Sequence, residues 1–492
     1  MARRPLVLEM PALGVIDLQA GHVGRQIVEA LRSAISSGEL AAHERLPSSR
    51  VLARSMGVSR STVTDAYEQL IAEGCLMAHR GSGTRVAFGS NSGLQPSKQL
   101  GEPGAESGLP ASSIGQRYLA IADMLSPLDS VPFSIAVPEG EVAMGPHWRR
   151  LSKRVRASTS SAPSGYPDPQ GLLALRQAIA SYLRKSRAVR CDPAHILITE
   201  GSQQGLYLAA KVLLSPGDPV WVEDPAYGGL TAVLDDRGAV LHATRVDAQG
   251  FDVASARQAA PEAVAAFVTP SHQFPMGMPL SMPRRLELVE WARAHGRWIV
   301  EDDYDSELRY TGQPFPAMQG LAPDSVIYLG TFSKILAPSL RLGYIVAPES
   351  LIKGFVGARS LMGRGSPSLE QHVLAAYMAE GYFEAHIRRI RTIYAQRRQA
   401  LVELIEKELP YLTVLPADQG MHLVVTLPSG LNDVDVANSA IKEGIALRAL
   451  SPRCAKAPKL SGLLLGFGGF SPGQLATSVR KLRMVLESAA GA

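Results

Sequence analysis

The sequence predicts a two-part α/β protein, in which a small helical head (residues 14–88) is joined by a flexible linker (89–130) to a large body (131–488). Short helical patterns and a Gly-rich hairpin signal fill the head. Residues 89–115 lack periodicity and are rich in Gly, Ser, Pro and Gln, which is typical of a linker. Apolar runs alternate with helical patterns up to about residue 348, which predicts a mostly parallel sheet with helices on both faces.

Composition limits the classes of protein to consider. The chain has 492 residues, 46% of them hydrophobic, which is enough for two or three domains. We expect no membrane partner and no signal peptide, because no apolar run reaches the roughly 18 to 20 residues of a membrane span. Three scattered cysteines indicate neither a disulfide framework nor a metal site, so we expect a cytoplasmic protein. A net charge of +5 permits a nucleic-acid partner.

The head has the pattern of three helices. Apolar residues four apart predict the first helix over 22–35. Ser48 is placed to cap a second short helix that Gly57 closes, and Ser59 is placed to cap a third, which stops near Gly74. Two short helices around a tight glycine turn are the helix-turn-helix arrangement.

A predicted hairpin, or wing, follows the third helix, with strands over 75–80 and 84–87. The exposed face of the third helix offers donors for phosphates and base edges: Arg60, Ser61, Thr62 and Thr64. Further arginines, expected mainly on phosphates, lie in the second helix and the wing: Arg50, Arg80 and Arg85. Spacing alone leaves open a small helical domain with an ordinary solvated face.

The head resembles the winged helix-turn-helix of GntR-type bacterial repressors. The matching motifs are Leu46–Arg50, Ser59–Val63, Ala66–Leu70, Glu73-Gly74 and Gly81–Thr84. The resemblance implies binding of double-stranded operator DNA through the third helix and the wing.

Within the body, apolar runs and helical patterns predict an ordered series of elements. Buried strands are expected over 196–198, 220–222, 264–268, 298–300 and 326–329, and helices over 203–214, 229–235 and 282–295. After residue 348 the pattern changes to helices over 371–378 and 382–407 and short strands over 412–415, 422–427 and 463–467. This second pattern predicts a smaller C-terminal α+β subdomain.

Chemically useful side chains follow the ends of these strands, where ligands bind in open α/β sheets. Lys334 can form a Schiff base with a carbonyl cofactor, and Arg341 can clamp a phosphate. A carboxylate such as Asp302 can hold a pyridinium nitrogen. Each residue alone also suits an ordinary role, such as a capping acid, a core aromatic or a solvated lysine. Together they have the chemistry of a pyridoxal phosphate site.

The body resembles fold-type-I aminotransferases of class I. The matching motifs are Tyr166–Arg176, Gly201–Gln204, Asp224–Tyr227, Glu301–Tyr304 and Ser333–Gly343. The resemblance implies that Lys334 carries pyridoxal 5'-phosphate and is the catalytic lysine. It further implies that Asp302 pairs with the ring nitrogen, Tyr304 bonds the ring oxygen and Tyr227 stacks on the ring. The implied phosphate-binding residues are Ser202, Gln203, Ser333 and Arg341.

A GntR-type head joined to such a body resembles the MocR/GabR subfamily of transcriptional regulators. The subfamily implies a head-to-tail homodimer, with each head resting on the other protomer's body. Two departures stand out. Phe274–Gly277 replaces the Asn-Pro-Thr-Gly motif of aminotransferases, and Gly229 stands where GABA-responsive relatives have an arginine. The stretch Leu460–Gly462, near the usual carboxylate-binding arginine, has none; nearby cations are Arg448, Arg453, Lys456 and Lys459.

Two functional hypotheses remain open. In the first, the chain is a DNA-binding regulator that senses pyridoxal phosphate, an amine or an amino acid. In the second, it is a working aminotransferase with an appended head. A DNA-binding scaffold without a cofactor leaves the complete cofactor set unexplained. Because the carboxylate-binding arginines are missing, we expect little transamination of common α-amino acids, and an effector that is the cofactor itself or an amine without that carboxylate contact.

Overall fold

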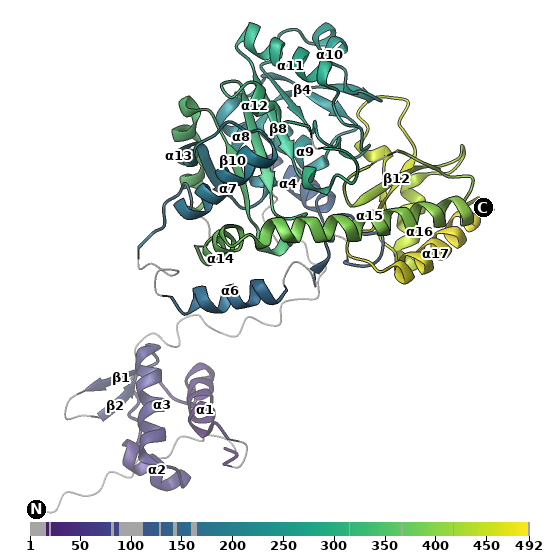
Figure 1. Ribbon diagram of the computed structural model, residues 1–492. Helices are drawn as coiled ribbons and strands as arrows, with labels where there is room; N and C mark the ends of the chain where they lie inside the picture. The colour runs from purple at the N-terminus through teal and green to yellow at the C-terminus, as the bar shows by residue number, and fades with distance from the viewer. Residues whose placement is uncertain are drawn as a thin grey trace, which may run out of the picture. The chain divides into compact units, whose positions relative to one another are not determined.

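The computed structural model describes residues 16–18, 21–79, 83–87, 112–126, 129–140, 145–158, 165–313, 315–365, 368–416 and 418–490. The chain divides into two compact units, Met1–Ala111 and Ser112–Ala492, and each is considered by itself (Figure 1). No helix in the described ranges is both long enough and apolar enough to cross a bilayer.

The small unit contains the predicted three helices and hairpin. Its elements are α1 (Val23–Ser37), α2 (Ser49–Met56), α3 (Arg60–Ala72), β1 (Leu76–His79) and β2 (Gly83–Val86), with the two strands antiparallel. Both predicted caps are confirmed: the Ser48 hydroxyl accepts from the Val51 N–H at 3.3 Å, and that of Ser59 from the Thr62 N–H at 3.1 Å. Gly57 ends α2 in the left-handed conformation, with φ 66°.

One apolar core holds the small unit together. Ile27 of α1, Leu52 of α2 and Leu70 of α3 are fully buried in it. The hydroxyl of buried Tyr67 donates to the Pro47 carbonyl at 2.9 Å and so ties α3 to the start of α2. Since the apolar sides face each other, the polar side of α3 is left to solvent.

The large unit is built on an eight-stranded sheet with the order β3-β10-β9-β8-β7-β4-β5-β6. The strands are β3 (Ile196–Thr199), β4 (Pro219–Asp224), β5 (Val240–Asp247), β6 (Gly250–Phe251), β7 (Ala265–Val268), β8 (Trp298–Asp303), β9 (Val326–Thr331) and β10 (Gly343–Val346). The strands from β9 to β5 are mutually parallel, as predicted. β10 is antiparallel to both neighbours, unlike the parallel arrangement that the apolar pattern predicts.

Helices cover both faces of this sheet (Figure 1). One face is covered by α8 (Ser202–Leu213), α9 (Gly228–Arg237) and α13 (Glu349–Gly363), and the other by α10 (Val253–Ala259), α11 (Met282–His295) and α12 (Met318–Leu321). Side chains alternate accordingly: Val220 and Val222 of β4 face α8, whereas Trp221 stacks on Trp291 of α11 with ring centroids 4.0 Å apart.

The large unit also contains a second, smaller sheet and further helices. The four-stranded antiparallel sheet, of order β11-β12-β14-β13, comprises β11 (Thr413–Val414), β12 (His422–Thr426), β13 (Arg448–Ala449) and β14 (Gly462–Gly466). The helices are α6 (Pro146–Arg156), α7 (Leu173–Ser186), α14 (Ser368–Ala379), α15 (Tyr382–Glu408), α16 (Asp433–Lys442) and α17 (Pro472–Ala490). Single 3-10 turns lie at Pro193–His195, Ser306–Leu308, Pro338–Leu340 and Ser451–Arg453.

Helix α4 (Ser113–Met124) lies inside the range 89–130, for which the sequence predicts a flexible linker, and it belongs to the large unit. The linker prediction therefore fails for this helix. Arg117 pairs with Asp235 at 2.9 Å, and the Tyr118 hydroxyl donates to Asp236 at 2.7 Å. These polar contacts are made with residues more than a hundred positions away, so the local sequence pattern gives no sign of them.

Candidate cofactor site and nucleic-acid interface

A cavity of about 100 Å³ lies in the large unit where the parallel strands end. It is lined by Ile135, Ala136, Ser202, Tyr227, Thr269, Phe274, Asp302, Tyr304, Lys334, Met421 and His422. Five residues predicted from sequence are therefore together: Ser202, Tyr227, Asp302, Tyr304 and Lys334. Thr269, Phe274 and the subdomain residues Met421 and His422 complete the wall, although no sequence motif assigned them a role.

Asp302 in β8 is a buried carboxylate with an oxygen that no described residue stabilises by a hydrogen bond. It is 9% exposed, and its Oδ1 has no hydrogen-bond partner among the described residues. Burial raises its pKa to about 7, helped by the charges of Asp303 and Glu223 and opposed by Lys334. A carboxylate in this state is stabilised by any cation brought to the free oxygen, and a ring N–H⁺ is such a cation.

Lys334 follows β9 and faces the same cavity. Burial lowers its pKa, while the carboxylates of Asp305 and Asp302 oppose the shift. A lowered pKa increases the fraction of neutral amine, which is the form that attacks a carbonyl carbon. The lysine therefore suits covalent attachment of an aldehyde.

Tyr304 is held by a buried histidine to which no sequence motif gave a role. His272 Nδ1 lies 2.9 Å from the Tyr304 hydroxyl and 2.8 Å from Asp305 Oδ2. Nδ1 carries at most one proton, and that proton is drawn to the negative Asp305. The tyrosine hydrogen is then free to point into the cavity, where it can donate to a ligand oxygen.

Tyr227 is fixed by a close approach of the chain at Gly229. The Gln203 amide donates to the Gly229 carbonyl at 3.0 Å. A Cβ added at Gly229 would lie 2.5 Å from the Tyr227 ring and 2.4 Å from Gln203 Oε1, so the position has no room for a larger residue. An arginine would fit there only if Tyr227 or Gln203 moved. The hydrogen bond also shows that the Gln203 side chain supports the Tyr227 loop, with one of its two amide hydrogens donated to Gly229.

The predicted phosphate side lies at the start of α8. Gly201, with φ 89°, precedes Ser202, and the first N–H groups of a helix have no intrahelical acceptor. β10 approaches so closely that a Cβ on Gly343 would lie 2.9 Å from the Gly201 Cα. The Ser333 hydroxyl accepts from Thr331 at 3.1 Å, and Arg341 is exposed in the left-handed conformation, outside the cavity lining.

Apart from Lys334 and Asp302, the described lining residues are apolar or neutral. Burial lowers the pKa of His422 to about 3, with the neighbouring His272 contributing, so the ring is uncharged. Lys334 is the one cation in the described lining. The predicted candidate Arg453 is half-buried and donates to the Ala449 carbonyl, and burial lowers its pKa to about 10.

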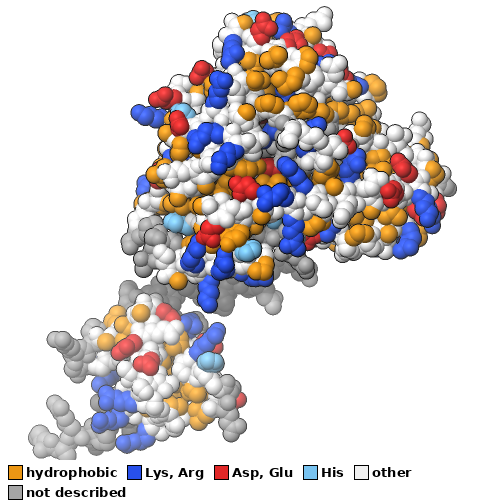
Figure 2. Space-filling view, in the orientation of Figure 1, with side chains coloured by type: hydrophobic (Ala, Val, Ile, Leu, Met, Phe, Trp, Pro, Cys, Tyr) orange, Lys and Arg blue, Asp and Glu red, His pale blue; other side chains and the backbone are white. Residues whose placement is uncertain are grey.

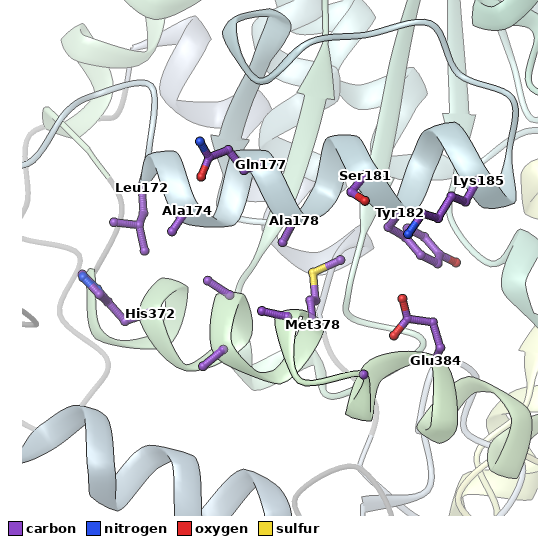
Figure 3. A pocket seen from close by; sticks show the side chains of 14 residues that line it. Leu172, Ala174, Gln177, Ala178, Ser181, Tyr182, Lys185, His372, Met378 and Glu384 are labelled. Carbon is purple, nitrogen blue, oxygen red and sulfur yellow. The ribbon is translucent and has the colours of Figure 1, made fainter.

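A larger cleft of about 820 Å³ lies elsewhere in this unit, between α7 and α14 (Figure 3). Apolar residues such as Leu172, Ala178 and Met378 make up half of its lining, with Lys185 and Glu384 at one end (Figure 3). It contains no residue predicted to bind a cofactor or DNA. The smaller cavity, with its lysine and its uncompensated carboxylate, is therefore the candidate site for chemistry.

In the small unit, three of the predicted DNA contacts are exposed: Arg50, Arg60 and Ser61. Figure 2 shows basic side chains gathered on the side of this unit where α2 and the start of α3 lie. Thr62 and Thr64 are less available. The hydroxyl of Thr62 lies 2.8 Å from that of Ser59, and Thr64 donates to the Arg60 carbonyl at 2.9 Å.

One of the predicted wing arginines, Arg85, is not simply exposed to solvent as a DNA contact. Arg85 donates to the His43 carbonyl at 2.8 Å, so part of its guanidinium fixes the preceding loop. Arg80 lies outside the described residues. Arg45 and Arg54 are further exposed cations, which lie outside the predicted set of DNA contacts. Arg45 lies beside the hairpin, since a Cβ on Gly83 would approach its Nε to 3.0 Å.

Comparison with known proteins matches both units. Residues 24–86 match the family "Bacterial regulatory proteins, gntR family", and residues 134–461 match "Aminotransferase class I and II". The chain is 38% identical over 94% of both lengths to the "Probable rhizopine catabolism regulatory protein MocR" of Rhizobium meliloti. The chain belongs to the MocR family of HTH-type transcriptional regulators.

This MocR-family chain is also similar to a second regulator and to a solved aminotransferase structure. It is 33% identical to the "HTH-type pyridoxine biosynthesis transcriptional regulator PdxR" of Corynebacterium glutamicum, over 90% of this chain and 91% of the relative. Among solved structures, LysN, an α-aminoadipate aminotransferase of Thermus thermophilus complexed with N-(5'-phosphopyridoxyl)-L-leucine, is 25% identical with a TM-score of 0.71. The match covers 77% of this chain and 98% of LysN. The body therefore has the fold of a family that binds pyridoxal phosphate.

Proposed function

We propose that this MocR-family regulator carries pyridoxal 5'-phosphate on Lys334, and that occupation of the cavity by this cofactor or by an amine or amino acid changes DNA binding by residues 14–88. The observation that carries the proposal is the unpartnered, buried oxygen of Asp302, in the same cavity as Lys334. No other described group satisfies that oxygen, and a protonated ring nitrogen would.

The cavity residues have distinct tasks in this proposal. When bound, the cofactor supplies an aldehyde that condenses with amines and a ring that withdraws electrons. Lys334 provides the neutral amine, Asp302 keeps the ring nitrogen protonated, and Tyr304 donates to the ring oxygen. Tyr227 packs against the ring, and the N–H groups of the first turn of α8 hold the phosphate with Ser202. Ser333 and Arg341 stay predictions for the outer phosphate oxygens.

Covalent trapping tests the proposal. Borohydride reduction of the protein incubated with pyridoxal phosphate, followed by peptide mass analysis, should place the adduct on Lys334. Lys334→Ala should abolish labelling, whereas replacing the exposed Lys353 by Ala should not change it. An adduct on another lysine, or no adduct in the unaltered protein, would refute the assignment.

An aminotransferase with an appended head is the second candidate, because the lysine, aspartate and tyrosine are all present. The absence of a guanidinium from the described lining argues against efficient turnover, since a planar fork is the usual partner of a substrate carboxylate. We therefore propose that the effector is the cofactor itself or an amine lacking that contact. Transamination of an ordinary amino acid at roughly 1 per second or faster would show that the chain is a working aminotransferase.

We also propose a homodimer. Several large apolar side chains of the large unit are exposed in the single chain, among them Tyr166 at 80%, Leu361 at 85% and Met362 at 43%. Arg364 lies 5.0 Å from the centre of the Tyr166 ring, so two of these segments adjoin. Exposed apolar groups of this size favour burial against a partner. Light scattering after size exclusion should give twice the mass of one chain.

A further inference from the structure

Helix α6 of the large unit has a cationic surface for which the proposed function has no use. Its solvent side carries five exposed cations: Arg149, Arg150, Lys153, Arg154 and Arg156. Figure 2 shows blue side chains gathered over this helix. Five cations within eight consecutive positions form a strip roughly 10 Å long, at about 1.5 Å of rise per residue.

The orientation of this surface is set by packing. Trp148 and Leu151, three positions apart, are buried on the inner side of α6. The Trp148 ring meets the edge of Tyr377 of α14 at a centroid distance of 5.4 Å. Because the apolar side of the helix is engaged in this way, the cations are held outward and cannot turn inward to find partners.

The surface keeps an excess of positive charge. Glu380 pairs with Arg154 and, at 3.8 Å, with Arg150. Within the described part of the chain, neither Lys153 nor Arg156 has an ion-pair partner. A cleft of about 500 Å³ beside the helix is lined by Arg149, Ser152, Lys153 and Arg156, with Glu370 as the one acid among its described lining residues. A phosphate placed there would meet several cations and a hydroxyl.

We infer that the α6 surface binds the sugar-phosphate backbone of duplex DNA, as a second contact in addition to the head. The surface offers dispersed positive charge, which neutralises phosphates irrespective of base sequence, so we expect the contact to add affinity with little sequence preference. A strip of roughly 10 Å matches the axial length of about three base pairs, at 3.4 Å per phosphate along each strand.

Two observations favour DNA over an anionic membrane. The chain already carries a GntR-type head, so duplex DNA is the polyanion brought to this molecule. A helix that binds a membrane surface inserts an exposed apolar side between the lipids. The apolar residues Trp148 and Leu151 of α6 are buried in the protein and cannot do so.

The test uses the full chain and the salt dependence of DNA binding. Lys153→Gln combined with Arg156→Gln removes two cations that have no ion-pair partner among the described residues. The matched control removes two exposed cations of the subdomain, Lys442→Gln with Arg480→Gln. Binding to a mixed-sequence duplex of about 40 base pairs is followed by anisotropy over a series of salt concentrations, and each lost phosphate contact should reduce the salt slope by about 0.9. Circular dichroism verifies that the variants are folded.

The expected result is a salt slope smaller by about 2 and at least ~3-fold weaker binding for the α6 pair, with the control pair unchanged. Glu370→Gln, which removes the acid from the cleft, should act in the opposite direction and strengthen binding. Equal losses in both pairs would indicate a general charge effect and overturn the inference, as would unchanged binding in the α6 pair. Loss of binding to phosphatidylserine vesicles without any effect on DNA would overturn it in favour of a membrane.

Discussion

Asp302 shows at the scale of one residue how the fold prepares a site for a charged partner. Its buried carboxylate has a pKa of about 7 and one oxygen without a hydrogen bond among the described residues. A hydrogen bond between ionised partners contributes about 1.5–3 kcal/mol. Asp302→Asn should therefore weaken pyridoxal phosphate binding by roughly 10- to 100-fold. Absorbance titration measures this, with the exposed Asp324→Asn as control; equal affinity in both variants would contradict the assigned role.

Gly229 is a second residue whose identity has a local cause. An added Cβ would lie 2.5 Å from the Tyr227 ring, whereas at the adjacent Gly228 it would lie 3.5 Å from Met124 Sδ, an ordinary contact. Gly229→Ala should displace Tyr227 and weaken cofactor binding by several-fold or more, at a typical cost of overpacking of about 1–3 kcal/mol. Gly228→Ala should leave binding within about twofold of the unaltered protein. The same absorbance titration compares them, and the opposite order of effects would refute the packing argument.

The residues of the candidate site were predictable where a side chain with suitable chemistry comes at the end of a predicted strand. Lys334, Asp302 and Tyr304 satisfy that rule and do meet in one cavity. His272 and His422 were missed because their roles depend on neighbours distant in sequence: Asp305 for the first and the Pro275 carbonyl for the second. A local pattern contains no information about such pairings.

At the scale of elements, α3 is the one that bears on recognition. Its buried side packs on α1 and α2, and its first turn presents Arg60, whose Nε lies 3.4 Å from the Ser49 hydroxyl. Arg60→Ala should cost about 1–3 kcal/mol of DNA binding if this arginine reads a base. Anisotropy with a duplex selected by the protein from a random pool measures the loss. The exposed Arg25→Ala on α1 is the control, and equal affinity in all three proteins would remove Arg60 from the interface.

Elements were predictable where burial follows a regular period. The predicted helix over 282–295 coincides with α11, and the predicted third helix with α3 within about a turn. The antiparallel direction of β10 was not predictable, because an apolar run of four residues reads the same in either direction. α4 was missed because Ile114 and Leu119, which would mark an apolar side, are 58% and 64% exposed and do not follow the core pattern.

At the scale of the whole molecule, buried carboxyls make stability depend on pH. Burial raises the pKa of each of four to about 7: Glu223, Glu301, Asp302 and Glu307. The folded protein keeps protons that the unfolded chain, with carboxyl pKa values near 4, has already released, so stability falls as pH rises through 7. Buried His386 and His422, whose pKa values are lowered, act oppositely only up to about pH 6.5. Between pH 6.5 and about 8 the thermal midpoint of the cofactor-free protein should therefore fall by a few degrees; a rise in calorimetry would contradict this account.

The two units of the chain allow the proposed sensing to be tested as a thermodynamic linkage. If pyridoxal phosphate changes DNA affinity by some factor, then DNA must change pyridoxal phosphate affinity by the same factor, typically about 5- to 150-fold. Lys334→Ala should abolish the effect of the cofactor on DNA binding while leaving DNA affinity without cofactor unchanged, because the lysine lies in the cavity of the large unit. Arg60→Ala should weaken DNA binding and leave cofactor affinity of the DNA-free protein unchanged. Anisotropy for DNA and absorbance for the cofactor, measured in the same buffer, give both factors. DNA affinity that is the same at zero and at saturating cofactor would show that the cavity does not regulate the head.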